Sequence, residues 1–142
     1  MNKRILALDI GEKRIGLALS DPTGTIASPY KVLVRKEGKS IISQILYEIE
    51  MNNVCEIVAG IPVSLNDTIG PQAQKILKFI EILREKTKIP VFTIDESLTT
   101  KTADDAMIGM DVSRKKRKGK IDMLAASVIL QSYLREKNEK KT

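Results

Sequence analysis

Three short apolar stretches open the chain, and turn-forming residues separate them. The stretches are 4–10 (RILALDI), 14–20 (RIGLALS) and 25–34 (TIASPYKVLV). Runs of this length, with apolar positions that alternate in the second, predict β-strands. The short connections, one of which reads DPTG, favour an antiparallel meander. Pro29 has no N–H for a central strand position, so we expect the third strand at an edge or a bulge.

Helical periodicity and buried strands then alternate along the rest of the chain. Residues 39–52 and a segment opened by Pro71 place apolar side chains on one helix face. The elements together predict one α/β domain over residues 1–142. It has a mixed five-stranded sheet, an antiparallel meander continued by parallel strands, with helices on both faces. The remaining predicted elements are strands at 54–60 and 89–95 and helices at about 99–110 and 121–135.

Composition restricts the chemistry that such a domain can perform. The 142 residues include one cysteine and no histidine. Ser-His-Asp triads, Cys-His pairs and histidine-ligated zinc are therefore excluded. An enzyme with this composition would depend on carboxylates, lysines, hydroxyls and a hard metal ion. No apolar run is long enough to span a membrane, and Asp9 interrupts the first one, so we expect a cytoplasmic protein.

Positive charge is concentrated in one segment of the chain. The formal net charge is +6, and the pattern predicts a basic loop over 113–120 and a mixed basic tail over 135–142. A local cationic patch favours a polyanionic partner such as nucleic acid, and a solvated loop without a partner is the alternative. The cations of the loop are Arg114, Lys115, Lys116, Arg117, Lys118 and Lys120.

Carboxylates stand at the ends of three predicted elements. Asp9 ends the first strand, Asp95 and Glu96 end the last strand, and Asp122 lies in the first turn of the last helix. If the first and fourth strands are parallel neighbours, these positions approach one another at one edge of the sheet. Oxygen ligands of this kind suit Mg²⁺ or Mn²⁺, and a pair of such ions can support phosphodiester cleavage. Gly11 would leave the main chain bare beside the site.

Each of these carboxylates also has a purely structural interpretation. Asp9 could be an ordinary turn residue, the 95–96 pair a plain strand exit, and Asp122 an acid that favours a helix N-terminus through the helix dipole. Because all three stand where this topology would gather them, we favour the functional interpretation.

Four segments stand in this order along the chain: LALDIGEKRIGLALSD, GIPVSLNDTIGPQAQ, DESLTT and KIDMLAASVILQSYL. Together they resemble the YqgF/RuvX family of the ribonuclease H-like superfamily. The resemblance implies a ribonuclease H-like fold and a metal-dependent nuclease that processes the 5′ end of the 16S ribosomal RNA precursor. It places catalytic and metal-binding roles on Asp9, Glu96 and Asp122, with Asp95 assisting. Ser97 stands where the family commonly has arginine, so that phosphate contact is either lost or supplied by Arg14 or the basic loop.

Other functions remain open at this point. A branched DNA junction is the alternative substrate, and cutting it symmetrically would require a homodimer rather than a monomer. A nucleic-acid-binding module without catalysis would explain the cations but not the acids. The first hairpin also looks like the phosphate-binding hairpin of sugar kinases and actin-like ATPases, but those proteins need two such domains around the nucleotide.

Overall fold

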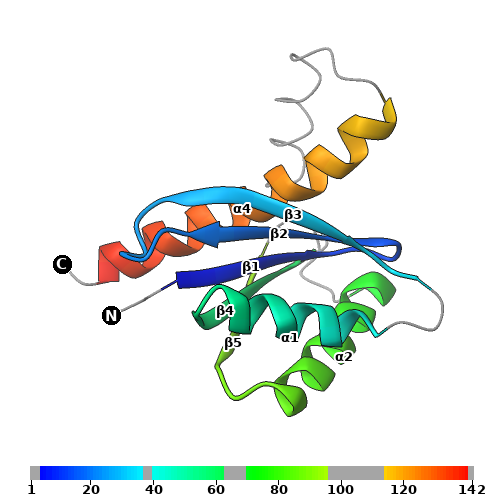
Figure 1. Cartoon of the computed structure of the whole chain (residues 1–142), viewed down its shortest axis with the longest axis horizontal. Coiled ribbons are helices and arrows are strands. Elements are labelled where there is room, and N and C mark those ends of the chain that lie inside the picture. The colour runs from blue at the N-terminus through cyan, green and yellow to red at the C-terminus, as the bar shows by residue number, and fades with distance from the viewer. Residues whose placement is uncertain (1–3, 37–39, 63–69, 96–113, 141–142) are drawn as a thin grey trace.

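The computed structural model describes residues 4–36, 40–62, 70–95 and 114–140. Within them, one mixed sheet has the strand order β3-β2-β1-β4-β5 (Figure 1). The first three strands form the expected antiparallel meander, and β4 runs parallel to both β1 and β5. The condition that the first and fourth strands are parallel neighbours is therefore met. The strands are β1 (Arg4–Ile10), β2 (Arg14–Ser20), β3 (Ala27–Val34), β4 (Val54–Ile61) and β5 (Val91–Asp95).

Helices cover both faces of this sheet, as the sequence predicts. Helices α1 (Ile41–Met51) and α2 (Pro71–Lys86) pack on one face, and α4 (Arg114–Lys140) lies across the other (Figure 1). Pro71 is the first residue of α2, where its missing N–H costs nothing. Of the helices within the described residues, none has a stretch long and apolar enough to cross a membrane.

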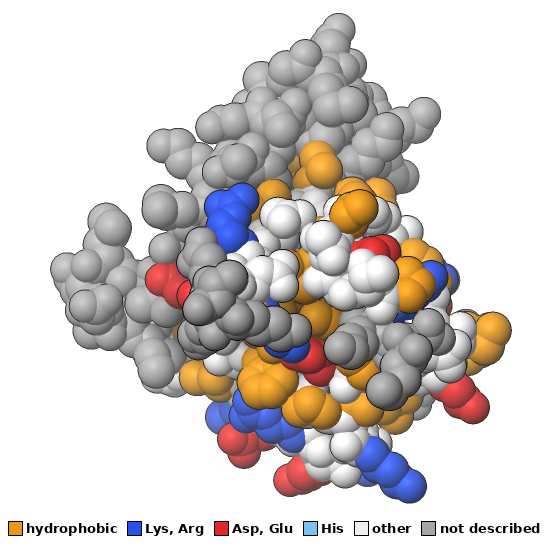
Figure 2. Space-filling model, turned by 90° about the vertical axis from the view of Figure 1, so that its left-hand side faces the viewer, with side chains coloured by type: hydrophobic (Ala, Val, Ile, Leu, Met, Phe, Trp, Pro, Cys, Tyr) orange, Lys and Arg blue, Asp and Glu red, His pale blue; other side chains and the backbone are white. Residues whose placement is uncertain are grey.

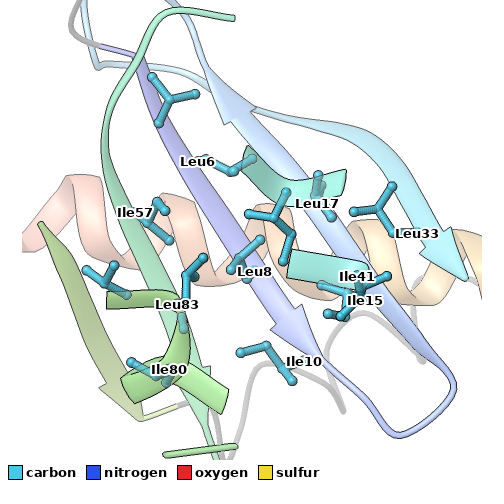
Figure 3. Close-up of a cluster of buried hydrophobic side chains, with 14 of the residues drawn as sticks. Leu6, Leu8, Ile10, Ile15, Leu17, Leu33, Ile41, Ile57, Ile80 and Leu83 are labelled. Carbon is cyan, nitrogen blue, oxygen red and sulfur yellow. The ribbon is translucent and has the colours of Figure 1, made fainter. Parts of the chain in front are cut away.

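Alternation along β1 divides the core into two layers. Leu6, Leu8 and Ile10 point toward α1 and α2 and contribute to the larger cluster shown in Figure 3. Ile5 and Ala7 point the other way and pack under α4. Because side chains alternate along a strand, position 9 belongs to the α4 face of the sheet.

The third strand lies at the edge of the sheet and contains a register shift. Ala18 pairs with Pro29, whereas its neighbour Leu17 pairs with Lys31. Tyr30 is therefore skipped in the pairing, and the proline sits beside the irregularity. The expected edge or bulge position of Pro29 is confirmed in both respects.

The prediction of a basic loop is wrong for residues 114–120, whose backbone forms the first turns of α4. Arginine and lysine are good helix formers, and a single interior glycine, Gly119, costs only about 1 kcal/mol. The cationic run therefore continues the last helix, which extends beyond the expected bounds of 121–135 at both ends. The predicted helix over 99–110 lies outside the described residues.

A buried charge replaces part of the apolar face expected on α1. Glu48 is only 3 % exposed. It accepts hydrogen bonds from Tyr30 Oη at 2.6 Å and from Lys31 Nζ at 2.7 Å, both on β3. Asn52, just after the helix, donates a further bond at 3.2 Å. These partners compensate the desolvation of the carboxylate and tie α1 to the edge strand.

Candidate functional site

Asp9 lies near the end of β1 and pairs in register with Gly16 of β2. The Cα atoms of such antiparallel partners are about 4.5–5.5 Å apart. The residue is half-buried, and the alternation described above directs it to the α4 face of the sheet. Whatever passes over Gly16 on that face therefore lies close to Asp9.

Helix α4 passes over Gly16 at Asp122. A Cβ atom built on Gly16 would lie 2.1 Å from the carbonyl oxygen of Asp122 and 3.0 Å from its Cβ. Only glycine leaves room for this approach, which brings Asp9 and Asp122 to the same place. Ala125 and Ala126, which follow on α4, are fully buried. The sequence indicated these alanines but missed the role of Gly16, whose only signal is a glycine inside a strand.

An ion pair links the hairpin to this helix. Arg14 Nε donates to Asp122 Oδ2 at 2.8 Å, and the two side chains are 34 % and 24 % exposed. The partial burial makes this pair stronger than an ordinary surface salt bridge. Arg14, expected as a phosphate contact, thus holds the carboxylate of Asp122 and places a positive charge beside it.

The tight β1–β2 turn gives Gly11 a structural role. Its N–H donates to the carbonyl oxygen of Arg14 at 2.9 Å, and a Cβ there would lie 2.7 Å from that oxygen. Turn closure thus requires the glycine whether or not a ligand approaches. Arg35 reinforces the turn, because its N–H donates to Lys13 O at 2.9 Å and its Nε to Gly11 O at 3.1 Å.

Asp95 ends β5 and pairs in register with Ile61 at the end of β4. Since β4 lies between β1 and β5, Asp9 and Asp95 are two strand spacings apart, about 10 Å. Val91 packs in the α1–α2 layer and Ile94 against the α4 layer. The alternation therefore assigns Asp95 to the face opposite Asp9, a placement that does not favour a ligand shared between them.

The described residues bring together two of the expected acids. Among them, no group of three or more Asp, Glu, His or Cys is arranged to hold a metal ion. Glu96, the third acid, lies outside the described residues. The two carboxylates that do converge have the oxygen chemistry that Mg²⁺ and Mn²⁺ prefer.

An open cavity of about 690 Å³ lies at this end of the sheet. Lysine and arginine outnumber carboxylates along its wall, which suits an anionic ligand. The wall consists of hairpin residues 11–14, Pro71, Gln72 and Lys75 of α2, and Asp122 of α4.

Comparison with known proteins decides the family. Residues 3–136 match the model of RuvX, which is described as a Holliday junction resolvase family. The chain belongs to the RuvX family. This confirms the resemblance found in the sequence, since the match covers all four of its segments.

RuvX-family relatives of similar length are found in several bacteria. The chain is 46% identical over 132 residues to a protein of Caldanaerobacter subterraneus subsp. tengcongensis, covering 92% of this chain and 95% of that protein. It is 44% identical over 138 residues to one of Thermoanaerobacter pseudethanolicus, covering 96% and 99%. Both relatives carry the name "Putative pre-16S rRNA nuclease".

Solved resolvase structures share the fold of this RuvX-family chain. Thermus thermophilus RuvC in complex with a Holliday junction substrate aligns with a TM-score of 0.57 at 14% identity, covering 94% of this chain and 96% of that one. The fowlpox virus resolvase in complex with Holliday junction DNA aligns with a TM-score of 0.59 at 13% identity, covering 94% and 97%. The likeness confirms the expected ribonuclease H-like fold.

Proposed function

We propose that this chain is a nuclease that hydrolyses phosphodiester bonds in structured nucleic acid, with the 16S ribosomal RNA precursor as its substrate. The observation that carries the proposal is the convergence of Asp9 and Asp122 at Gly16, beside a cation-rich cavity. Membership of the RuvX family and the names of its relatives support the reaction and the substrate.

Asp9, Asp122 and Glu96 are the proposed catalytic carboxylates and ligands of Mg²⁺ or Mn²⁺. Bound ions of this kind supply an activated water and stabilise the leaving oxygen. Because Asp95 is assigned to the face opposite Asp9, we favour Glu96 as the third ligand.

Cations near these carboxylates have two proposed roles. Arg14 orients Asp122 through the 2.8 Å ion pair and places its charge where a phosphate would lie. The basic run 114–120 forms the helical turns that lead up to Asp122, and Figure 1 shows these turns, in gold, extending beyond the sheet. Cations at a helix N-terminus oppose the helix dipole. Contact with a polyanion relieves that repulsion, which supports a role of the run in binding nucleic acid.

The experiment compares cleavage of 16S precursor RNA and of a four-way DNA junction in Mg²⁺, in Mn²⁺ and in chelator. Asp9→Asn and Asp122→Asn should each lose at least about 100-fold in cleavage rate while still binding the substrate. Asp95→Asn is the matched control, because the same change is made on the opposite face, and it should cleave like the wild type.

The outcomes of this experiment separate the candidate functions. Cleavage that survives the chelator or both substitutions would overturn the proposal. Binding without cleavage by the wild type would favour a non-catalytic module. Cleavage of the junction alone would favour the resolvase reaction, whose symmetric cuts need a homodimer, and the mass of the complex would report that assembly.

A further inference from the structure

A second cavity of about 490 Å³ adjoins the one beside Asp122. The two share a wall formed by Gly11 and Glu12 of the hairpin and by Gln72 and Lys75 of α2. A ligand that fills the first cavity can therefore continue into the second along this shared wall. We name the second cavity the hairpin–α2 groove.

The groove combines an apolar floor with cationic sides. Ile76 and Phe79 of α2 contribute to the floor, and Ile82 adds a side chain that remains 48 % exposed. Ile82 is exposed and Phe79 is only partly buried, so both side chains present apolar surface to solvent. The floor thus offers apolar area to a flat, uncharged group.

Three cations surround this floor, against one carboxylate. Arg35, Lys75 and Lys78 line the groove together with Glu12. Glu12 and Lys75 are 3.7 Å apart with both side chains about three-quarters exposed, so this ion pair is weak and leaves the lysine available to another anion. The guanidinium of Arg35 lies over the Phe79 ring, 5.1 Å from its centre, which places a positive charge directly on the apolar floor.

The groove lies between the β1–β2 hairpin and α2. Figure 2 shows another face of the molecule, on which cationic and anionic side chains are interspersed among apolar ones. In Figure 1 the two termini lie at one end of the sheet, and the β1–β2 hairpin and the start of α2 lie at the other. The groove is therefore at the hairpin end, next to the proposed catalytic carboxylates.

We propose that the hairpin–α2 groove binds a single-stranded extension of the nucleic acid that is cleaved beside Asp9 and Asp122. Phosphates of the extension lie against Lys75 and Lys78, and a base covers Phe79 and Ile82. A cavity of this volume accepts groups the size of a small molecule, such as one or two nucleotides, and excludes a duplex. The inference rests on the proposed nuclease function and adds that the substrate has an unpaired segment next to its cleavage site.

The test measures binding by fluorescence anisotropy in chelator, so that no cleavage takes place. The probes are an RNA hairpin with a single-stranded extension and the same hairpin without it. Lys78→Gln, which changes a residue that lines the groove but not the cavity beside Asp122, should reduce the steepness of log affinity against log salt by about 0.7 for the extended probe, at about 0.7 per phosphate contact. The variant should bind the blunt probe like the wild type. Lys86→Gln, which removes the same charge from the far end of α2, should change the binding of neither probe.

The outcomes distinguish this inference from the proposed function. An unchanged salt dependence for the extended probe, or an equal loss of affinity for both probes, would overturn the proposal that the groove binds a single strand. The first of these results would instead favour a protein partner for this surface. A selective loss for the extended probe would support the groove even if the wild type cleaved neither RNA nor DNA. In that case the nuclease proposal, and not the binding site, would fail.

Discussion

The approach of α4 to β2 at Gly16 predicts a large effect for a small substitution. Gly16→Ala adds one methyl group, which would lie 2.1 Å from the carbonyl oxygen of Asp122. The obstructing atom belongs to a helix backbone and cannot rotate away as a side chain could. The helix must therefore move by about 0.9 Å, the difference between 2.1 Å and the shortest realistic separation of 3.0 Å.

This displacement has a cost in stability and a cost in activity. Overpacking a tight contact typically costs about 1–3 kcal/mol. With the usual unfolding entropy per residue, each kcal/mol lowers Tm by about 3 °C in a chain of 142 residues. Asp122 moves with the helix, and a misplacement of about 1 Å in a catalytic group can cost roughly 100-fold in rate. We therefore expect Tm to fall by about 3–10 °C and cleavage by about two orders of magnitude.

Calorimetry and a cleavage assay at a temperature where both proteins are folded would measure these effects. Gly70→Ala is the matched control: it adds the same methyl group just before Pro71, at a position where nothing lies within 4 Å of the new atom. Alanine is a poorer helix cap than glycine, which lowers the free energy of unfolding, but it also restricts the unfolded chain, which raises it, so the two effects oppose each other. If the two variants matched in Tm and in rate, α4 could not lie over Gly16 as described.

Two further predictions concern charges outside the site. Burial raises the pKa of Glu48, but hydrogen bonds from Lys31 and Tyr30 lower it further, so its pKa lies below the ordinary value. The ionised Glu48 and its partners therefore stabilise the fold at pH values above the ordinary pKa of a carboxyl group. This contribution to stability is lost as the pH falls through the depressed pKa of Glu48. Glu48→Gln should cost about 2 kcal/mol of the free energy of unfolding at neutral pH, which lowers Tm by about 7 °C, and it should have the Tm of the wild type in strong acid. A difference in Tm that did not depend on pH would contradict this. Burial and a hydrogen bond to Glu56 raise the pKa of the Tyr133 phenol, so that bond weakens only above the ordinary tyrosine range. Tyr133→Phe should lower Tm by about 3 °C at neutral pH without changing cleavage, and an ultraviolet titration of the wild type should show one tyrosine that ionises late.

The sequence predicts the strand architecture well because its local signals agree with one another. The bounds of β1 and β2 match the prediction, since apolar runs and turn residues define both ends. The parallel pairing of β1 and β4 follows from strand composition and from the helix between the two strands. The apolar faces expected on the strands and helices also agree with the structure. A repeat of two residues in a strand, or of 3.6 residues in a helix, identifies the buried side chains without any knowledge of their partners.

The sequence is less informative where partners lie far apart in the chain. Glu48 resembles a solvated charge on α1 until its partners on β3 are known, and Gly16 resembles any glycine in a strand until α4 is placed over it. The cationic run 114–120 is misjudged for a different reason. Its charge suggests a loop, whereas the helix propensity of arginine and lysine, together with continuity into α4, decides the outcome.

Long-range packing also explains why the candidate site depends on residues remote from it. Beyond Asp122, α4 buries Ile129, Leu130 and Leu134 against the sheet. A methyl group at Gly16 cannot be accommodated by lifting the whole helix, because that movement would expose this apolar layer. The helix must instead tilt about its packed segment, and the displacement is then largest near Asp122. The core under α4 therefore determines how closely Asp122 approaches Asp9. Substitutions that loosen this core should lower cleavage activity even where the chain remains folded.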